Sequence, residues 1–269
     1  MEAIEIPIQA STRAVSFASQ EFALEGVLHL PEFAEDAPLV VGVHGLFSSA
    51  ESPKQIALAQ ACARRGIGYF RFSHRGCGNS DGEFGRVTSL DARCADLADA
   101  VAAARREAPF GPRLGLFGSS LGGTVCLAMA RALHASAVVT LATPLRSDIV
   151  RRVVEPGDPV ESNLPEWDPA ALAFDVRERA AGVSNLLILH GDSDKVVAPS
   201  EAFRVYQLGA TPKRIIMFRD GDHRLSREEN QEKFQRETVN WFRDKLLSRG
   251  KAEGQNEGRP RPPRAHGFG

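Results

Sequence analysis

The chain has 269 residues, of which 43% are hydrophobic and 25% are charged, as is usual for a globular protein. Its formal net charge at pH 7 is -1, which gives no reason to expect nucleic acid or an acidic membrane surface as a partner. No stretch approaches the roughly 18 uninterrupted apolar residues of a transmembrane helix, so we expect no membrane insertion.

The N-terminal residues and the cysteines favour a cytoplasmic protein. Residues 1–15 lack both a basic segment and a continuous apolar segment, so we expect no signal peptide. The four cysteines show neither Cys-x-x-Cys spacing nor a cluster typical of metal ligands. Cys62, Cys94 and Cys126 lie beside Ala and Leu in helical patterns, where buried reduced thiols are expected.

Short apolar runs alternate with amphipathic stretches from about residue 14 to residue 248. Residues 14–31 predict two antiparallel strands with a turn near residues 19–22. The later runs predict, in chain order, strand 37–45, helix 53–66, strand 67–76, helix 88–107, strand 113–118, helix 121–134, strand 136–144, strand 184–191, helix 199–208, strand 214–221 and helix 226–247. Continuous apolar strands that alternate with helices indicate an α/β fold, with a mostly parallel central sheet and helices on both faces.

Two segments depart from this alternation. Residues 145–184 are longer than one crossover helix and contain Pro and acidic residues with a few apolar side chains, namely Leu164, Trp167, Leu172 and Phe174. Long inserts of this kind are often lids, so we expect a small helical lid over the carboxyl edge of the sheet. Residues 249–269 are rich in Gly, Pro and Arg and predict a disordered tail. The expected organisation is one domain over residues 1–248 that carries the lid, followed by the tail.

Two adjacent serines lie where strand 113–118 gives way to helix 121–134. A nucleophile on so tight a turn needs small residues two positions before and two positions after it. Gly118 and Gly122 meet this requirement around Ser120, whereas a turn centred on Ser119 would place Phe117 and Leu121 there. Ser120 is therefore the candidate nucleophile.

A serine nucleophile requires a histidine base held by a carboxylate. Asp192 and Asp194 follow strand 184–191, and His223 follows strand 214–221, so all three would reach one edge of the sheet. We favour Asp194, because Asp192 directly follows His190 and Gly191 and is placed to bond the turn backbone. His44 and His190 also precede glycines at strand ends, where a backbone or packing role is expected.

An oxyanion hole would need two N–H donors at the same edge of the sheet. The Leu121 N–H lies at the positive end of the helix that begins there. The strand that ends in His44 and Gly45 brings the Leu46 N–H to this edge as the natural second donor.

These motifs make the sequence resemble the α/β-hydrolase superfamily over roughly residues 14–248. The matching pieces are "HGLFSS", "FRFSHRGCGNSDGEF", "GSSLGG", "LHGDSDKVVAP" and "DGDHRLS". They look most like the bacterial cinnamoyl- and feruloyl-esterase, serine aminopeptidase-like and monoacylglycerol lipase branch. The resemblance implies Leu46 as an oxyanion donor and Asp194 as the triad acid. The chain departs from that branch at Ser73, where an Asp is usual, and at Cys77, where a His is usual; these positions are expected to shape a loop.

We therefore expect a serine hydrolase that cleaves small-molecule carboxylic esters through Ser120, His223, Asp194 and an acyl-enzyme, with no metal or organic cofactor. Phe47 and the lid side chains, Trp167 among them, suggest an acyl or aryl pocket of modest size. The same triad would serve a thioesterase. It would also serve an aminopeptidase in which acidic residues of the lid hold the substrate amine; these acids are Glu155, Asp158, Glu161, Glu166 and Asp168. A non-catalytic binding protein on the same fold is the alternative from another class. The sequence leaves open whether the chain forms a homo-oligomer.

Overall fold

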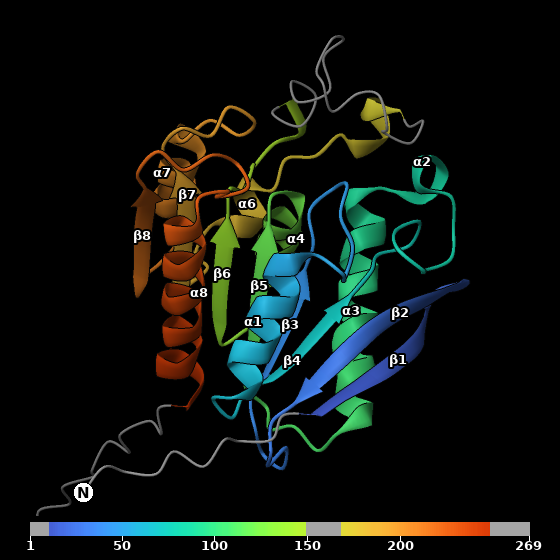
Figure 1. Cartoon of the computed structure of the whole chain (residues 1–269). Coiled ribbons are helices and arrows are strands. Elements are labelled where there is room, and N and C mark those ends of the chain that lie inside the picture. Colours follow the sequence, from blue (N-terminus) through green and yellow to red (C-terminus); the bar gives the residue numbers. More distant parts are fainter. Residues whose placement is uncertain (1–10, 149–167, 248–269) are drawn as a thin grey trace, which may run out of the picture.

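The computed structural model describes residues 11–148 and 168–247, which contain an eight-stranded sheet (Figure 1). The strand order is β1-β2-β4-β3-β5-β6-β7-β8, and every pair from β4 to β8 in that order is parallel. The strands are β1 (Ser11–Ser19), β2 (Phe22–Leu30), β3 (Leu39–Val43), β4 (Gly68–Phe72), β5 (Leu114–Ser119), β6 (Ala137–Leu141), β7 (Leu186–Gly191) and β8 (Lys213–Phe218). The predicted antiparallel hairpin is present, since β1 pairs with β2 and β2 with β4 in antiparallel register.

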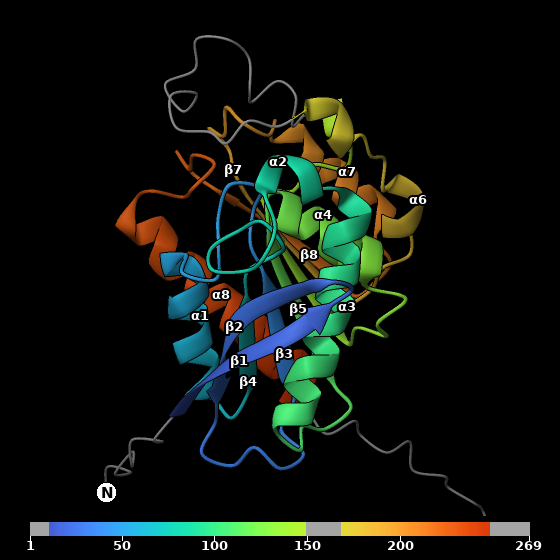
Figure 2. The same ribbon diagram turned by 90° about the vertical axis from the view of Figure 1, so that its right-hand side faces the viewer.

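Helices cover both faces of the sheet, as the apolar strands predicted (Figures 1 and 2). The helices are α1 (Pro53–Ala63), α2 (Phe84–Val87), α3 (Leu90–Glu107), α4 (Leu121–Met129), α6 (Arg177–Ala180), α7 (Ser200–Leu208) and α8 (Glu228–Phe242), with a 3-10 turn at Pro169–Leu172 and a π turn at Arg243–Leu247. Side chains of α1 and α8 share one apolar cluster with the sheet, and those of α3, α4 and α7 share the other. The core is therefore two apolar layers with the sheet between them.

Local sequence explains where these elements begin and how deeply they are buried. The Ser89 hydroxyl accepts a hydrogen bond from the Ala92 N–H at 3.1 Å, which caps the first turn of α3. Residues of β3, β4 and β6 are buried throughout, because helices cover both faces of these central strands. Only alternate residues are buried in the second half of the edge strand β1.

Parallel pairing brings the ends of β3, β5, β7 and β8 to one edge of the sheet. The loops that leave this edge carry Leu46, Ser120, Asp194 and His223, each just after its strand. The fold thus gathers the residues that sequence alone identified as candidates.

The expected lid and tail fall largely outside the described residues. Leu164, Trp167 and residues 248–269 lie outside them, so the lid and the tail stay predictions. In the described part of the insert, the 3-10 turn leads to Leu172, which is buried against Leu46 and Leu121. This segment therefore packs against the two loops that carry the candidate oxyanion donors.

Candidate active site

The turn at Ser120 has the strained backbone that a nucleophile elbow requires. Ser120 has φ 52° and ψ -126°, a conformation that is unfavourable for a residue with a Cβ atom. The Ser120 N–H donates to the Leu141 carbonyl oxygen at 2.7 Å, which ties the turn to β6. A Cβ atom on Gly118 would lie closer than 3.0 Å to the Gly122 backbone, and one on Gly122 would lie 2.6 Å from the His44 carbonyl oxygen. The two glycines thus let the elbow close against β3.

Asp194 and His223 are in direct contact. The His223 Nδ1 atom lies 2.8 Å from Oδ2 of Asp194, and the His223 side chain is 20% exposed. The other carboxylate oxygen, Oδ1, accepts hydrogen bonds from the backbone N–H groups of Val196 and Val197 at 2.8 and 2.9 Å. Because the carboxylate accepts from Nδ1, the Nε2 atom of a neutral His223 is left without a proton and can act as a base.

The surroundings of Asp194 keep its carboxylate charged. Burial alone would raise the pKa of Asp194, but hydrogen bonds from His190, His223 and the Val197 N–H together hold that pKa well below its usual range. His190 contributes through Nε2, which lies 3.2 Å from Oδ2 of Asp194 and 3.0 Å from the Val197 carbonyl oxygen. A charged carboxylate in this position orients the His223 ring.

The competing candidates occupy different surroundings. The Asp192 side chain is exposed and accepts from the neighbouring Ser193 hydroxyl at 2.9 Å. His44 and His190 are buried, and each has a ring nitrogen at hydrogen-bond distance from a carbonyl oxygen. Of the two aspartates after β7, it is Asp194 that contacts His223.

The two candidate oxyanion donors lie on neighbouring loops. A Cβ atom on Gly45 would lie 3.5 Å from Ser120 Cβ and 3.4 Å from the Ser119 carbonyl oxygen, so the loop after β3 touches the elbow. The side chains of Leu46 and Leu121 are buried in one small apolar cluster. Leu121 is the first residue of α4, where backbone N–H groups lack partners within the helix. The main chain here is suited to bind a developing oxyanion.

Of the two residues expected to line an acyl pocket, Phe47 is described by the structure and Trp167 is not. Phe47 is 38% exposed, and its ring centroid lies 5.4 Å from that of Phe84. Phe47 lies in the loop that follows β3, and its ring packs against the buried Phe84 of α2. Trp167 lies outside the described residues.

Sequence reasoning missed a buried polar network behind the loop that follows β3. Asp96 of α3 accepts from the Arg75 guanidinium at 2.6 and 2.9 Å, and its other oxygen lies 3.2 Å from His74 Nδ1. The His74 backbone N–H donates to Nε2 of His44 at 3.0 Å. On the same helix, the buried Arg93 contacts the Gly45 and Leu46 carbonyls. The sequence did carry a signal for Arg93 and Asp96, because both are charged residues on the apolar stripe of helix 88–107.

Ser73 occupies a position where the esterase-like branch that this sequence resembles usually has an Asp. Its polar atoms form hydrogen bonds with the loops at this edge of the sheet. Its hydroxyl accepts from the Ala50 N–H at 3.0 Å, and its carbonyl oxygen accepts from the Ser80 hydroxyl at 2.8 Å. Ser73 thereby ties the loop after β3 to the loop after β4.

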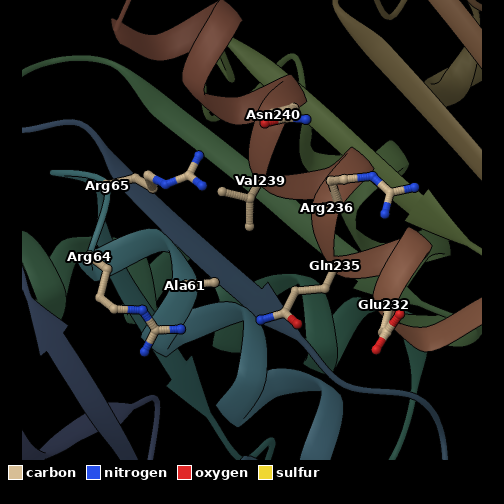
Figure 3. A pocket seen from close by; sticks show the side chains of 8 residues that line it. All are labelled: Ala61, Arg64, Arg65, Glu232, Gln235, Arg236, Val239 and Asn240. Carbon is tan, nitrogen blue, oxygen red and sulfur yellow. The ribbon is translucent and has the colours of Figure 1, made fainter. Parts of the chain in front are cut away.

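Two surface hollows lie outside this cluster. One, of about 270 Å³, lies between α1 and α8 (Figure 3) and is lined by Ala61, Arg64, Arg65, Glu232, Gln235, Arg236, Val239 and Asn240. Ala61 lies at the end of α1, Arg64 and Arg65 follow that helix, and the other lining residues lie on α8 from its second turn onward, whereas His223 precedes the first turn of α8. The second, of about 420 Å³, is lined by Arg219, Asp220, Arg227, Glu229, Asn230 and Lys233. Neither hollow includes Ser120, Asp194 or His223.

Within residues 11–148 and 168–247, no three His, Cys, Asp or Glu side chains are grouped as metal ligands would be. Over the same ranges, no helix combines the length and apolar character needed to cross a membrane. The four cysteines are buried and unbridged, and burial raises the pKa of Cys62 to about 12 and that of Cys94 to about 11.

Comparison with known proteins agrees with the sequence resemblance. The family model described as serine aminopeptidase, S33 matches residues 34–164, which include Leu46 and Ser120 and end before Asp194. The uncharacterized protein YfhR of Salmonella typhimurium is 29% identical, over 68% of this chain and 63% of its own length. The chain thus spans less than two thirds of this curated relative.

Solved structures with the same architecture include a protein with ferulic acid bound and an esterase. Est1E of Butyrivibrio proteoclasticus, solved with ferulic acid bound, has a TM-score of 0.72 and 20% identity over 87% of this chain and 100% of its own. An esterase of Pyrococcus furiosus has a TM-score of 0.72 and 18% identity over 88% of this chain and 92% of its own. The chain therefore has the α/β-hydrolase fold, and its similar proteins include esterases. A shared fold does not by itself define the reaction.

Proposed function

We propose that this chain is a serine hydrolase of the carboxylesterase type, which cleaves esters of small to medium acyl or aryl-acyl groups. The observation that carries the proposal is the 2.8 Å contact between His223 Nδ1 and Asp194 Oδ2 at the edge where the strained Ser120 turn lies. A base held by a buried carboxylate, at the same edge of the sheet as a serine in an elbow, is the kind of arrangement that can make a hydroxyl nucleophilic.

In the first half of the reaction, His223 Nε2 takes the hydroxyl proton of Ser120 while Oγ attacks the ester carbonyl carbon. The carbonyl electrons move to the oxygen, and the Leu46 and Leu121 N–H groups bind the resulting oxyanion. As the tetrahedral intermediate collapses, the bond to the alcohol oxygen breaks. That oxygen takes the proton from His223, which leaves the acyl group on Ser120.

In the second half, a water molecule gives its proton to His223 and attacks the acyl carbon. Collapse of this intermediate releases the carboxylic acid and returns the proton to Ser120. Asp194 stays ionised throughout and stabilises the imidazolium form of His223. The balance of atoms and charge needs no metal or organic cofactor.

The pocket proposed for the acyl group is apolar. The exposed ring of Phe47, which packs against Phe84, supplies an aromatic wall beside Leu46. The similarity to Est1E, which was solved with an aromatic acid bound, supports an aryl-acyl substrate as one member of the class. Trp167 is the second proposed contact.

The test is hydrolysis of nitrophenyl esters from acetate to octanoate by wild type and Ser120→Ala. We expect turnover that peaks at one chain length and falls by at least about a thousandfold in the variant. Full activity in Ser120→Ala would refute the nucleophile. A wild-type protein that neither turns over any ester nor reacts with a nitrophenyl phosphonate would favour the non-catalytic binding protein.

An aminopeptidase or amidase is the second candidate, because the matching family model is that of a serine aminopeptidase. Of the lid acids that could hold a substrate amine, Asp168 is the described one. Its carboxylate accepts from the Ala170 N–H at 2.8 Å and caps the 3-10 turn. Comparison of aminoacyl arylamides with esters of the same acyl group separates these two candidates. Thioesters of that acyl group, assayed alongside, would report thioesterase activity.

The remaining sequence-based expectations belong to the same proposal. They are a single domain over residues 1–248, a cytoplasmic location and a small-molecule ester as the partner, with neither nucleic acid nor membrane involved. Sedimentation of the purified chain would measure its oligomeric state.

A further inference from the structure

Arg93 is a buried arginine whose charge faces peptide carbonyls. It lies on α3 and is 1% exposed. Its Nη2 atom donates to the Leu46 carbonyl oxygen at 3.0 Å, and its Nη1 atom donates to the Gly45 carbonyl oxygen at 3.4 Å. In the described part of the chain, no carboxylate forms an ion pair with it, since the nearby Asp96 pairs with Arg75 and His74. The guanidinium is thus directed at two successive peptides of the loop after β3.

A second donor reaches the same Gly45 oxygen. His44 Nδ1 lies 2.7 Å from it, while His44 Nε2 accepts from the His74 backbone N–H. Because Nε2 must accept that bond, the proton of a neutral His44 resides on Nδ1, which donates to Gly45. Burial, followed by the charges of His74 and Arg93, holds the pKa of His44 well below its usual range, so this form persists at neutral pH.

The Gly45 oxygen and the Leu46 N–H belong to one peptide group. In a trans peptide the C=O and N–H bonds point in opposite directions, so donors that hold the oxygen also fix the direction of the N–H. Donation to the oxygen also polarises the amide and strengthens its N–H as a donor. Both effects act on the N–H assigned to the oxyanion hole.

We propose that Arg93 is a positioning residue for ester hydrolysis, which orients and polarises the Gly45–Leu46 peptide so that its N–H binds the transition-state oxyanion. This inference rests on the proposed function. His44 assists from the other side of the same oxygen. Arg93 acts through the main chain and touches no reacting atom.

Packing alone does not account for an arginine at this position. Burying a guanidinium without a carboxylate is costly, and an apolar side chain of similar size would fill the same space. Its Nε atom has no hydrogen-bond partner in the described residues, and its remaining contact is a weak one to Cys77 Sγ at 3.6 Å. The contacts that Arg93 does make converge on the two carbonyls that flank Leu46.

The test compares Arg93→Met, Arg93→Lys and the control Arg71→Met. Arg71 is also buried and donates to a carbonyl of the same loop, but to that of Ala50, at 2.9 Å. Active sites are counted by the nitrophenol burst from a phosphonate, so that misfolded protein does not enter kcat. A trifluoromethyl ketone inhibitor, which forms an oxyanion when Ser120 adds to it, then reports the oxyanion hole directly.

For Arg93→Met we expect kcat per titrated site to fall about 10- to 100-fold, less than for loss of a whole oxyanion donor, with KM changed less than about twofold. The inhibition constant of the ketone should rise by the same factor as kcat/KM falls. Arg93→Lys should lie between Met and wild type, and Arg71→Met should stay within about twofold of wild type.

A wild-type kcat per titrated site in Arg93→Met would overturn the inference, as would an unchanged ketone affinity. If Arg93→Met does not fold, Arg93→Lys decides in the same way. A wild-type protein that the phosphonate does not label would instead overturn the proposed function, so the two failures are distinguishable.

Discussion

Replacement of Asp194 by Asn tests how the acid controls the base. The carboxylate of Asp194 uses Oδ1 for the Val196 and Val197 N–H groups and Oδ2 for His223 Nδ1. His190 Nε2 also lies 3.2 Å from Oδ2, but it has the Val197 carbonyl oxygen at 3.0 Å as a second acceptor. An asparagine keeps one oxygen, which the two backbone donors require, so its NH2 group must face His223. The Nδ1 atom then has to accept a hydrogen bond, and the ring proton moves to Nε2. His223 in this tautomer cannot take the Ser120 proton.

The reversed orientation of the asparagine is strongly disfavoured. It would set the NH2 group against the Val196 and Val197 N–H groups and leave both donors unpaired. Each unpaired buried donor costs about 1–3 kcal/mol, so the two together disfavour the reversed form by about 2–6 kcal/mol and limit it to about one molecule in thirty at most. We therefore expect kcat to fall by at least about 30-fold and by as much as about four orders of magnitude, which is about 2–5.5 kcal/mol of activation free energy.

The assay is nitrophenyl ester hydrolysis by Asp194→Asn, with urea unfolding to confirm a folded protein. Asp192→Asn is the matched control, because its exposed side chain bonds only to Ser193 among the described residues, and it should keep wild-type kcat. A folded Asp194→Asn protein within tenfold of wild type would refute the tautomer argument. So would an Asp192→Asn variant with the larger loss.

Three other outcomes follow from the structure. Burial lowers the pKa of His74 to about 4, so between pH 6.5 and 4 the unfolded chain binds a proton that the folded chain does not. The free energy of unfolding in urea should therefore fall by about 2 kcal/mol for this histidine from pH 7 to pH 5, and less in His74→Asn. Gly122→Ala should lower the free energy of unfolding by about 1–3 kcal/mol or more, because its Cβ meets main chain, whereas Gly45→Ala, with its Cβ at 3.4 Å or more, should lower it by less. Ser120→Gly should unfold at a higher temperature than Ser120→Ala by several degrees, because glycine relieves about 1 kcal/mol or more of strain at φ 52°; an equal Tm would contradict this.

The sequence was sufficient to place the candidates Ser120, Asp194 and His223 at one edge of the sheet, because each place depends on a few neighbouring residues. Gly118 and Gly122 could be assigned from steric requirements alone, and the structure shows main chain where their side chains would be. Asp194 and His223 could be assigned from their places after apolar strands, since parallel strands end at one edge. The short helices α2 and α6 were missed, because a four-residue helix has too few turns to show a period.

The polar network behind the loop after β3 could not be assembled from local patterns. Asp96 lies 21 residues from Arg75, and Arg93 lies 48 residues from Gly45. The pairing depends on how α3 packs against the sheet, which no local pattern specifies. On helix 88–107, a charged residue on the apolar stripe indicates only that a buried hydrogen-bond partner exists. It does not indicate which residue that partner is.

Three energetically unusual features of the molecule lie at the edge of the sheet that carries Ser120. This edge has a non-glycine residue at φ 52° in Ser120, a carboxylate buried in Asp194, and a guanidinium buried against carbonyls in Arg93. The strain at Ser120 and the burial of the Arg93 guanidinium oppose folding, whereas the cost of burying the Asp194 carboxylate is offset by its hydrogen bonds. The apolar layers on both faces of the sheet supply the packing that offsets the remaining cost. Positive φ alone does not distinguish this edge, because Gln20, Asp36 and Asn185 have it elsewhere in the chain. The combination of a strained serine with a histidine-bound carboxylate and a buried guanidinium at one edge is what a reaction would use and a binding scaffold would not need.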